Sequence, residues 1–132
     1  MEPLHIKPTE DTPEVYFNVD EKKFKISGQC FPENAAAFFE PIMKWIEKYL
    51  QDPLDNTVVE LKFEYLNTAS SKLVTEMIYS LTKLFDQGKN LEMKWYYEDK
   101  DMDINNLGKD ISFATAMDME FIKIPTDEDE DF

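Results

Sequence analysis

The sequence of 132 residues contains no arginine and only one histidine. Arginine supplies the bidentate guanidinium that reads guanine and grips phosphate, and the net charge of -14 repels a nucleic-acid backbone. We therefore expect no nucleic-acid partner. Since His5 stands alone, neither a histidine metal site nor a histidine-based catalytic triad can be assembled. The sequence thus predicts no catalytic residue and no metal ligand, and it argues against an enzyme.

Cysteine, glycine and long apolar runs are also scarce. Cys30 is the single cysteine, so it cannot form an internal disulfide, and we expect it to be a small buried hydrophobic side chain. Three glycines do not make a glycine-rich phosphate loop, and no cofactor is predicted. No apolar run reaches the length of a membrane span or follows a basic leader. We expect a cytoplasmic protein without membrane insertion.

The residues that are present favour one folded domain. Hydrophobic residues make up 42% of the chain and aromatic residues 14%, which is enough to bury a core at this length. Five of the 28 acidic residues form a run at positions 127–131. A run of like charge at a chain end is typically solvated and without fixed structure. We therefore predict a single domain over residues 1–125 and an acidic, disordered tail over residues 126–132.

Alternation of apolar and polar residues predicts the strands. A hairpin is expected from residues 15–19 and 24–27, two further strands from residues 59–65 and 91–97, and a short last strand near residues 121–124. In the two longer strands charged residues recur on one side, so one face of the sheet carries charge. The charged positions, which we expect to be plain solvated surface, are Glu60, Lys62, Glu64, Glu92 and Lys94.

Helical spacing of apolar residues predicts three helices. The first covers residues 38–49 and starts or kinks at Pro41. The second follows Thr68 and stops at Gly88, and a weaker third helix covers residues 102–114. Right-handed crossovers that proceed in one direction place their helices on one face of a sheet. Because the strands alternate, we predict an α/β fold in which a mixed sheet of about five strands has helices packed mainly on one face.

The junction between the third strand and the second helix is the candidate site. Residues 66–72 hold three hydroxyls, and Asn67 and Thr68 lie at or beside the helix N-cap. A helix N-terminus has unpaired backbone N–H groups and a partial positive charge, so a phosphoryl group on Thr68 would be stabilised there. The competing interpretation is an unmodified threonine that simply caps the helix, a role worth about 1 kcal/mol.

Three flanking residues have secondary roles in this hypothesis. Ser70 is a second candidate for phosphorylation, and Ser71 is expected to cap the helix or to pack in its first turn. Lys72 is in position to contact a phosphate on Thr68, although a solvated surface lysine is the simpler interpretation.

Four segments carry a resemblance to a known family. They are MEPL at residues 1–4, PTEDTPEV at 8–15, FEYLNTASSK at 63–72 and KWYY at 94–97. With these segments the chain resembles the SiaC family of bacterial regulatory phosphoproteins, which have the STAS-like fold of anti-sigma factor antagonists. The third segment is the most specific, and the resemblance covers nearly the whole chain except the acidic tail. It implies a STAS-like, SiaC-type domain over residues 1–125.

The resemblance also implies a function. A dedicated kinase would phosphorylate Thr68 and a PP2C-type phosphatase would reverse the reaction, in a partner-switching circuit. The unmodified protein would bind its kinase and an output protein such as a diguanylate cyclase, which links it to cyclic di-GMP, and phosphorylation would block the output complex. Two alternatives stay open. One is a constitutive interaction module, for example a dimer using the second helix; the other is an enzyme that uses clustered acids with a divalent cation at the acidic tail.

Overall fold

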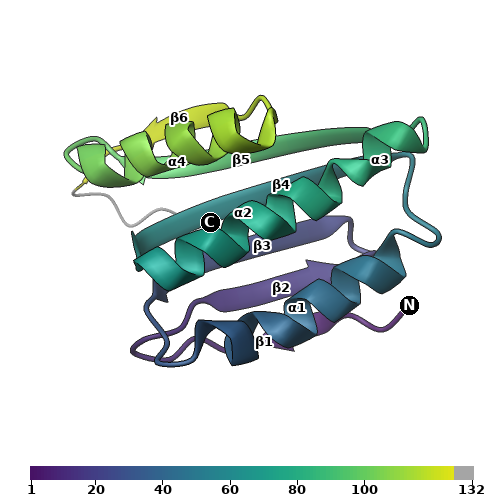
Figure 1. Ribbon diagram of the computed structural model, residues 1–132, viewed down its shortest axis with the longest axis horizontal. Coiled ribbons are helices and arrows are strands. Elements are labelled where there is room, and N and C mark those ends of the chain that lie inside the picture. Colours follow the sequence, from purple (N-terminus) through teal and green to yellow (C-terminus); the bar gives the residue numbers. More distant parts are fainter. Residues whose placement is uncertain (127–132) are drawn as a thin grey trace.

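The computed structural model describes residues 1–126 of the chain. Apart from Thr126, the predicted acidic tail at residues 126–132 lies outside the described residues. The described part forms one sheet with a layer of helices packed against it (Figure 1). None of the helices in this part is long and apolar enough to cross a membrane.

The sheet has six strands, and their order in space is their order in the sequence. They are β1 (Leu4–Ile6), β2 (Glu14–Asn18), β3 (Lys23–Cys30), β4 (Asn56–Leu66), β5 (Asn90–Glu98) and β6 (Glu120–Ile124). The α/β class is confirmed, but the sheet has one strand more than the five expected. The additional strand, β1, is three residues long, which is too short to show an alternating pattern, and its His5 pairs with Tyr16 of β2.

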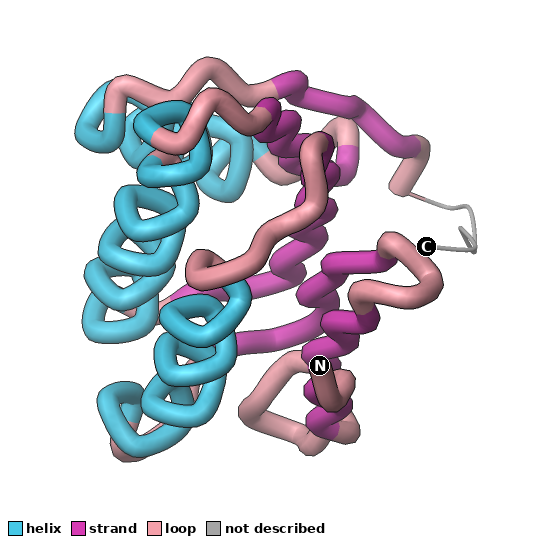
Figure 2. The backbone as a smooth tube through the Cα atoms, turned by 90° about the vertical axis from the view of Figure 1, so that its right-hand side faces the viewer, coloured by secondary structure: helices cyan, strands magenta, loops and turns pink. Residues whose placement is uncertain are grey.

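The pairing of the strands changes from antiparallel to parallel along the sheet. β1, β2 and β3 pair antiparallel, whereas β3 to β6 are parallel. The connections in the parallel part contain α1 (Ala35–Tyr49), α2 (Thr68–Leu81) followed by α3 (Lys83–Asp86), and α4 (Met102–Thr115). Every crossover steps to the next strand in the same direction. The helices therefore lie on one face of the sheet and leave the other open, as predicted (Figure 2).

Two helices differ from their predicted bounds. α1 begins before Pro41 because the Asn34 side chain caps the helix, accepting a hydrogen bond from the Ala37 amide at 3.0 Å. Pro41 therefore lies inside α1. The long second helix is in fact two helices, because α2 ends at Leu81 and the short α3 follows. Gly88 comes just after α3, and its φ of +73° is the left-handed conformation that commonly ends a helix.

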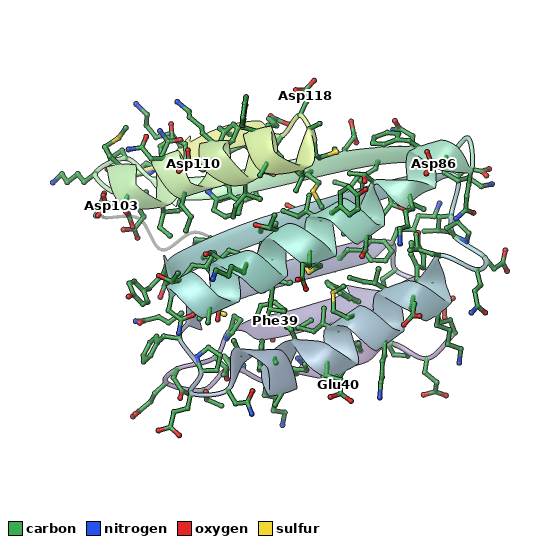
Figure 3. All side chains as sticks on the ribbon, in the orientation of Figure 1. Phe39, Glu40, Asp86, Asp103, Asp110 and Asp118 are labelled. Carbon is green, nitrogen blue, oxygen red and sulfur yellow. The ribbon has the colours of Figure 1, made fainter. Side chains whose placement is uncertain are left out.

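The core lies between the helices and the covered face of the sheet. Phe39 of α1 is 1% exposed and packs in this layer, whereas its neighbour Glu40 is exposed (Figure 3). Trp95 of β5 is fully buried, and its indole Nε1 donates a hydrogen bond to the Ile104 carbonyl at 3.1 Å. Trp95 also fills the space beside Gly108 of α4, where a Cβ atom would come within 2.5 Å of the ring. These contacts hold α4 against β5.

Candidate functional site

The N-terminus of α2 follows directly on the carboxyl end of β4. Asn67 is the N-cap: its backbone is extended, and its Oδ1 accepts a hydrogen bond from the Ser70 amide at 2.9 Å. The Asn67 amide in turn donates to the Cys30 carbonyl at 3.0 Å, which joins the start of α2 to the end of β3. The helix thus begins where the sequence predicts, with Asn67 and not Thr68 as the capping residue.

Thr68 is the first residue of α2, and its side chain is exposed. Its carbonyl accepts a hydrogen bond from the Ser71 hydroxyl at 2.8 Å, whereas its own hydroxyl makes no hydrogen bond to another residue within 1–126. Because Asn67 already caps the helix, a capping role does not account for Thr68. An exposed hydroxyl without a structural partner is chemically suited to accept a phosphoryl group.

Ser70 is placed differently. Its side chain is fully buried, and its Oγ has no hydrogen-bond partner within the described residues. It lies near the buried Cys30 thiol. Burial raises the pKa of that thiol, and the neighbouring Ser70 hydroxyl partly offsets the rise. The structure does not favour Ser70 as a second phosphorylation site, since a kinase cannot reach this hydroxyl unless the start of α2 opens.

The other two flanking residues lie in the first turn of α2. Ser71 is half-buried and bonds back to Thr68, so it packs in the turn and does not cap it, while Lys72 is exposed. The first turn of α2 contains no acidic residue, whereas α4 has Asp101 as its N-cap and Asp103 in its first turn. Both helices start at the carboxyl ends of parallel strands. The N-terminus of α2 is therefore the better of the two places for an added negative charge.

Two exposed aromatic side chains adjoin this site. Tyr65 precedes Thr68 by three residues and is 53% exposed, and its ring meets the Phe31 ring nearly edge-on with centroids 5.8 Å apart. A register shift after Gly28 gives β4 one extra residue, so that Glu64 and Tyr65 are both exposed. The pair was not predicted, because a bulge interrupts the alternation on which strand prediction depends. Gly28, with a φ of +122°, is the signal that could have revealed it.

A hollow at the carboxyl ends of β4 and β5 is a concave feature near this site. It has a volume of about 330 Å³ and is lined by residues that include Lys62 and Tyr96. The Tyr96 hydroxyl donates to Glu60 at 2.8 Å, and burial together with this carboxylate raises the pKa of Tyr96 to about 12. A phenol with that pKa stays protonated near neutral pH and does not act as a base there. Within residues 1–126, no three His, Cys, Asp or Glu side chains are grouped to hold a metal ion.

A family model matches most of the chain. The model of the SiaC family regulatory phosphoprotein matches residues 6–124. A relative is an uncharacterized protein of Pseudomonas aeruginosa strain UCBPP-PA14, which is 26% identical over 121 residues. The aligned region covers 89% of this chain and 96% of that protein.

Solved structures share the fold. Apo-SiaC from Pseudomonas aeruginosa matches with a TM-score of 0.80 at 24% identity, covering 93% of this chain and 98% of that chain. A chain in the crystal structure of the diguanylate cyclase SiaD in complex with its activator SiaC, from the same organism, matches with a TM-score of 0.84 at 22% identity. That match covers 92% of this chain and 99% of that chain. At these identities the matches establish the fold.

Proposed function

The chain belongs to the SiaC family of regulatory phosphoproteins, and from this we propose that it is a non-enzymatic signalling protein controlled by reversible phosphorylation of Thr68. The unphosphorylated protein binds and regulates an output protein, and phosphorylation blocks that complex. A kinase adds the phosphate and a PP2C-type phosphatase removes it, in the cytoplasm. The output protein in this proposal is a diguanylate cyclase, because SiaC of Pseudomonas aeruginosa is the activator of such a cyclase.

The exposed hydroxyl of Thr68 at the N-terminus of α2 is the observation that carries the proposal. Phosphorylation adds about 1.5 to 2 negative charges at neutral pH. A helix N-terminus stabilises such a charge by about 0.3 to 2 kcal/mol, and no acidic residue in the first turn of α2 opposes it. The phosphorylated domain therefore keeps its fold, and the switch has to act on the partner.

The free-energy cost of burying a phosphate on Thr68 under a bound partner is large enough to act as a switch. A partner that packs over Thr68 would have to remove the phosphate from water without a counter-charge, at a cost of several kcal/mol. Moving a population from almost fully bound to almost fully free requires about 5.5 kcal/mol. The two quantities are of the same order. Interface exclusion can therefore control the output complex without a rearrangement of the domain.

Binding measurements with three variants test the proposal. Titration calorimetry against the diguanylate cyclase from the same cell should give similar affinities for the wild type and Thr68→Ala, and an affinity at least about tenfold weaker for Thr68→Asp. Ala36→Asp, which adds the same charge to the exposed first turn of α1, is the matched control and should bind like the wild type.

Phosphosite mapping of the protein isolated from its own cells completes the test. We expect phosphate on Thr68 and none on the buried Ser70. Equal affinities of the wild type, Thr68→Ala and Thr68→Asp, together with an unmodified Thr68, would contradict the switch. That result would favour the constitutive interaction module instead.

A further inference from the structure

Phe31 and Tyr65 form an exposed aromatic pair at the carboxyl end of the sheet. Phe31 directly follows β3 and is 38% exposed, and Tyr65 is the last residue but one of β4 and is 53% exposed. The two rings contact each other, and neither belongs to the buried core or to the side chains packed against it. A single exposed apolar side chain needs no explanation, but two rings held together on the surface form a patch. Such a patch indicates a contact surface.

The backbone on both sides holds this pair in place. Tyr65 lies within the ladder between β3 and β4, and the Phe31 amide donates a hydrogen bond to the Asp11 carbonyl at 2.8 Å. Asp11 belongs to a closed turn, in which the Thr9 hydroxyl accepts a hydrogen bond from the Thr12 amide at 3.0 Å. The two rings are therefore presented by ordered backbone. A partner that binds them loses little conformational entropy in ordering this surface.

The pair adjoins the proposed switch residue. Consecutive Cα atoms are 3.8 Å apart, so the Cα of Tyr65 is at most about 11 Å from that of Thr68. Phe31 is joined to the same place, because the Asn67 amide donates to the carbonyl of Cys30, the residue directly before Phe31. Figure 1 shows that β4 leads directly into the N-terminus of α2. The aromatic pair and Thr68 thus occupy one end of the molecule.

The proposed switch requires that the partner covers more than Thr68. A phosphate at the rim of an interface would remain in water, so Thr68 has to lie well inside the surface that the partner covers. A stable interface covers about 800 Å² on each partner. A surface of that size with Thr68 inside it extends to Tyr65 and Phe31. Thr68 and Ala69 have small side chains, whereas large aromatic side chains typically supply most of the affinity of an interface.

We propose that Phe31 and Tyr65 are the apolar anchor through which the unphosphorylated protein binds its output cyclase, an inference that rests on the proposed function. The cyclase surface that receives them is an apolar pocket bordered by lysine or arginine. Glu64 directly precedes Tyr65 and Glu10 lies in the turn that holds Phe31; both are exposed, and neither forms an ion pair within 1–126. The bases of the cyclase pair with these carboxylates and leave no counter-charge for a phosphate on Thr68.

Two variants and a matched control test the anchor. In titration calorimetry against the diguanylate cyclase from the same cell, Phe31→Ser and Tyr65→Ser should each bind at least about tenfold more weakly than the wild type. The control is Phe85→Ser on α3, because Phe85 is also exposed, at 48%, but lies beyond the far end of α2, a helix about 20 Å long. It should bind like the wild type. Thermal denaturation of all four proteins checks that they fold.

Thr68→Asp, measured beside these variants, separates the anchor from the switch. If Phe31→Ser and Tyr65→Ser bind like the wild type while Thr68→Asp binds weakly, the anchor is overturned and the switch stands. If the two aromatic variants bind weakly and Thr68→Asp binds like the wild type, the anchor stands and the switch is overturned. A wild type that does not bind the cyclase overturns both.

Hydroxyl-radical footprinting tests the contact without any substitution. In the wild type alone, the radicals should oxidise Phe31, Tyr65 and Phe85, because all three side chains are exposed. In the complex with the cyclase, oxidation of Phe31 and Tyr65 should fall severalfold, since the centre of an interface excludes water, while that of Phe85 should not change. If a complex forms and Phe31 and Tyr65 are oxidised as in the free protein, the anchor lies elsewhere.

Discussion

The two faces of the sheet differ in what covers them, and the contrast is clearest within β4. Val59, Leu61 and Phe63 point to the helices and are at most 3% exposed. Val58 and Glu60 point to the other face, against which none of the described helices packs (Figure 2). Adjacent residues of a single strand therefore border a closed apolar layer on one side and a solvated surface on the other, since side chains alternate along a strand.

This contrast separates the residues that hold the fold from those that are free for other roles. Burial on the covered face stabilises the fold by about 25 cal/mol per Å² of apolar surface. On the open face, a polar contact such as the one between Tyr96 and Glu60 contributes only about 1 kcal/mol. We therefore expect the stability effects of substitutions to decrease from the covered face to the open face and then to the exposed helix ends.

The largest effect is expected where α4 meets the covered face. In Gly108→Ala, the new methyl group would lie 2.5 Å from the indole of Trp95, which is fully buried. Overpacking costs about 1 to 3 kcal/mol or more, and displacement of the ring also weakens its hydrogen bond to Ile104, whereas the gain in helix propensity is only about 1 kcal/mol. Urea denaturation should show a net loss of about 3 kcal/mol.

The control for Gly108→Ala is Asn106→Ala on the exposed side of the same helix. This change gives a similar gain in propensity without a contact to Trp95, so it should leave the free energy of unfolding unchanged or slightly higher. If Gly108→Ala left the free energy of unfolding unchanged, the covered face would have room for a methyl group beside Trp95, and the expected contrast with the open face would be wrong.

Two neighbouring valines of β4 give the most direct comparison of the faces. Val59→Ala removes two methyl groups from the covered face at about 0.8 kcal/mol each, and the cavity adds to this, so we expect a loss of about 2 kcal/mol. Val58→Ala makes the same chemical change on the open face, where the side chain is only half-buried, and should cost less than about half as much. Chemical denaturation of both variants measures the difference. Equal losses would mean that the open face is covered in solution.

Much of the fold could be predicted because this alternation is strong. The charged positions of β4 and β5 are enough to indicate a sheet with helices on one face. β1 was missed because Leu4–Ile6 is too short to show a period. The sequence predicts a start of α1 that is too late, because Pro41 suggests a helix start or kink, whereas the helix begins at the Asn34 cap and contains Pro41.

The candidate site was predictable in position but not in detail. Residues 66–72 locate the N-terminus of α2, since a strand pattern stops there and a helical one starts. The sequence ranks Thr68 ahead of Ser70 but cannot show their burial, and the structure does: Ser70 is buried against the core while Thr68 is exposed. The neighbouring pair of Phe31 and Tyr65 depends on a bulge, which is a property of the pairing between two strands and not of either strand alone.

A smaller effect is expected for the polar contact on the open face. Tyr96→Phe removes the hydrogen bond to Glu60 and should cost about 1 kcal/mol near neutral pH. The pKa of Tyr96 is raised from 10.0 to about 12, so the folded protein holds this proton more tightly than the unfolded chain. The resulting stabilisation is complete below about pH 10 and is lost as the pH rises toward 12.

The measurement for Tyr96→Phe is the free energy of unfolding between pH 8 and pH 12, expressed as the difference from the wild type, because lysines also titrate in this range. The difference should fall above about pH 10 and reach zero or change sign toward pH 12, because a pKa raised by about two units corresponds to about 3 kcal/mol before screening by solvent, more than the hydrogen bond contributes at neutral pH. The control is Tyr65→Phe, whose hydroxyl makes no hydrogen bond within residues 1–126 and whose removal should have little effect at neutral pH. A difference that stays constant up to pH 12 would contradict the coupling to Glu60.

The smallest effect on stability is expected at Thr68, where the proposed effect on binding is largest. Thr68→Asp adds a negative charge to the exposed first residue of α2, which a helix N-terminus stabilises by about 0.3 to 1 kcal/mol, so the free energy of unfolding should stay equal or rise slightly. Asn67→Ala, one residue earlier, removes the capping hydrogen bond to Ser70 and should cost about 1 kcal/mol. Thermal denaturation of both variants separates the two roles. Suppose instead that Thr68→Asp destabilised the domain as much as Asn67→Ala does. Weaker partner binding by Thr68→Asp would then be explained by a destabilised α2, and exclusion of the partner by the added charge would not be needed.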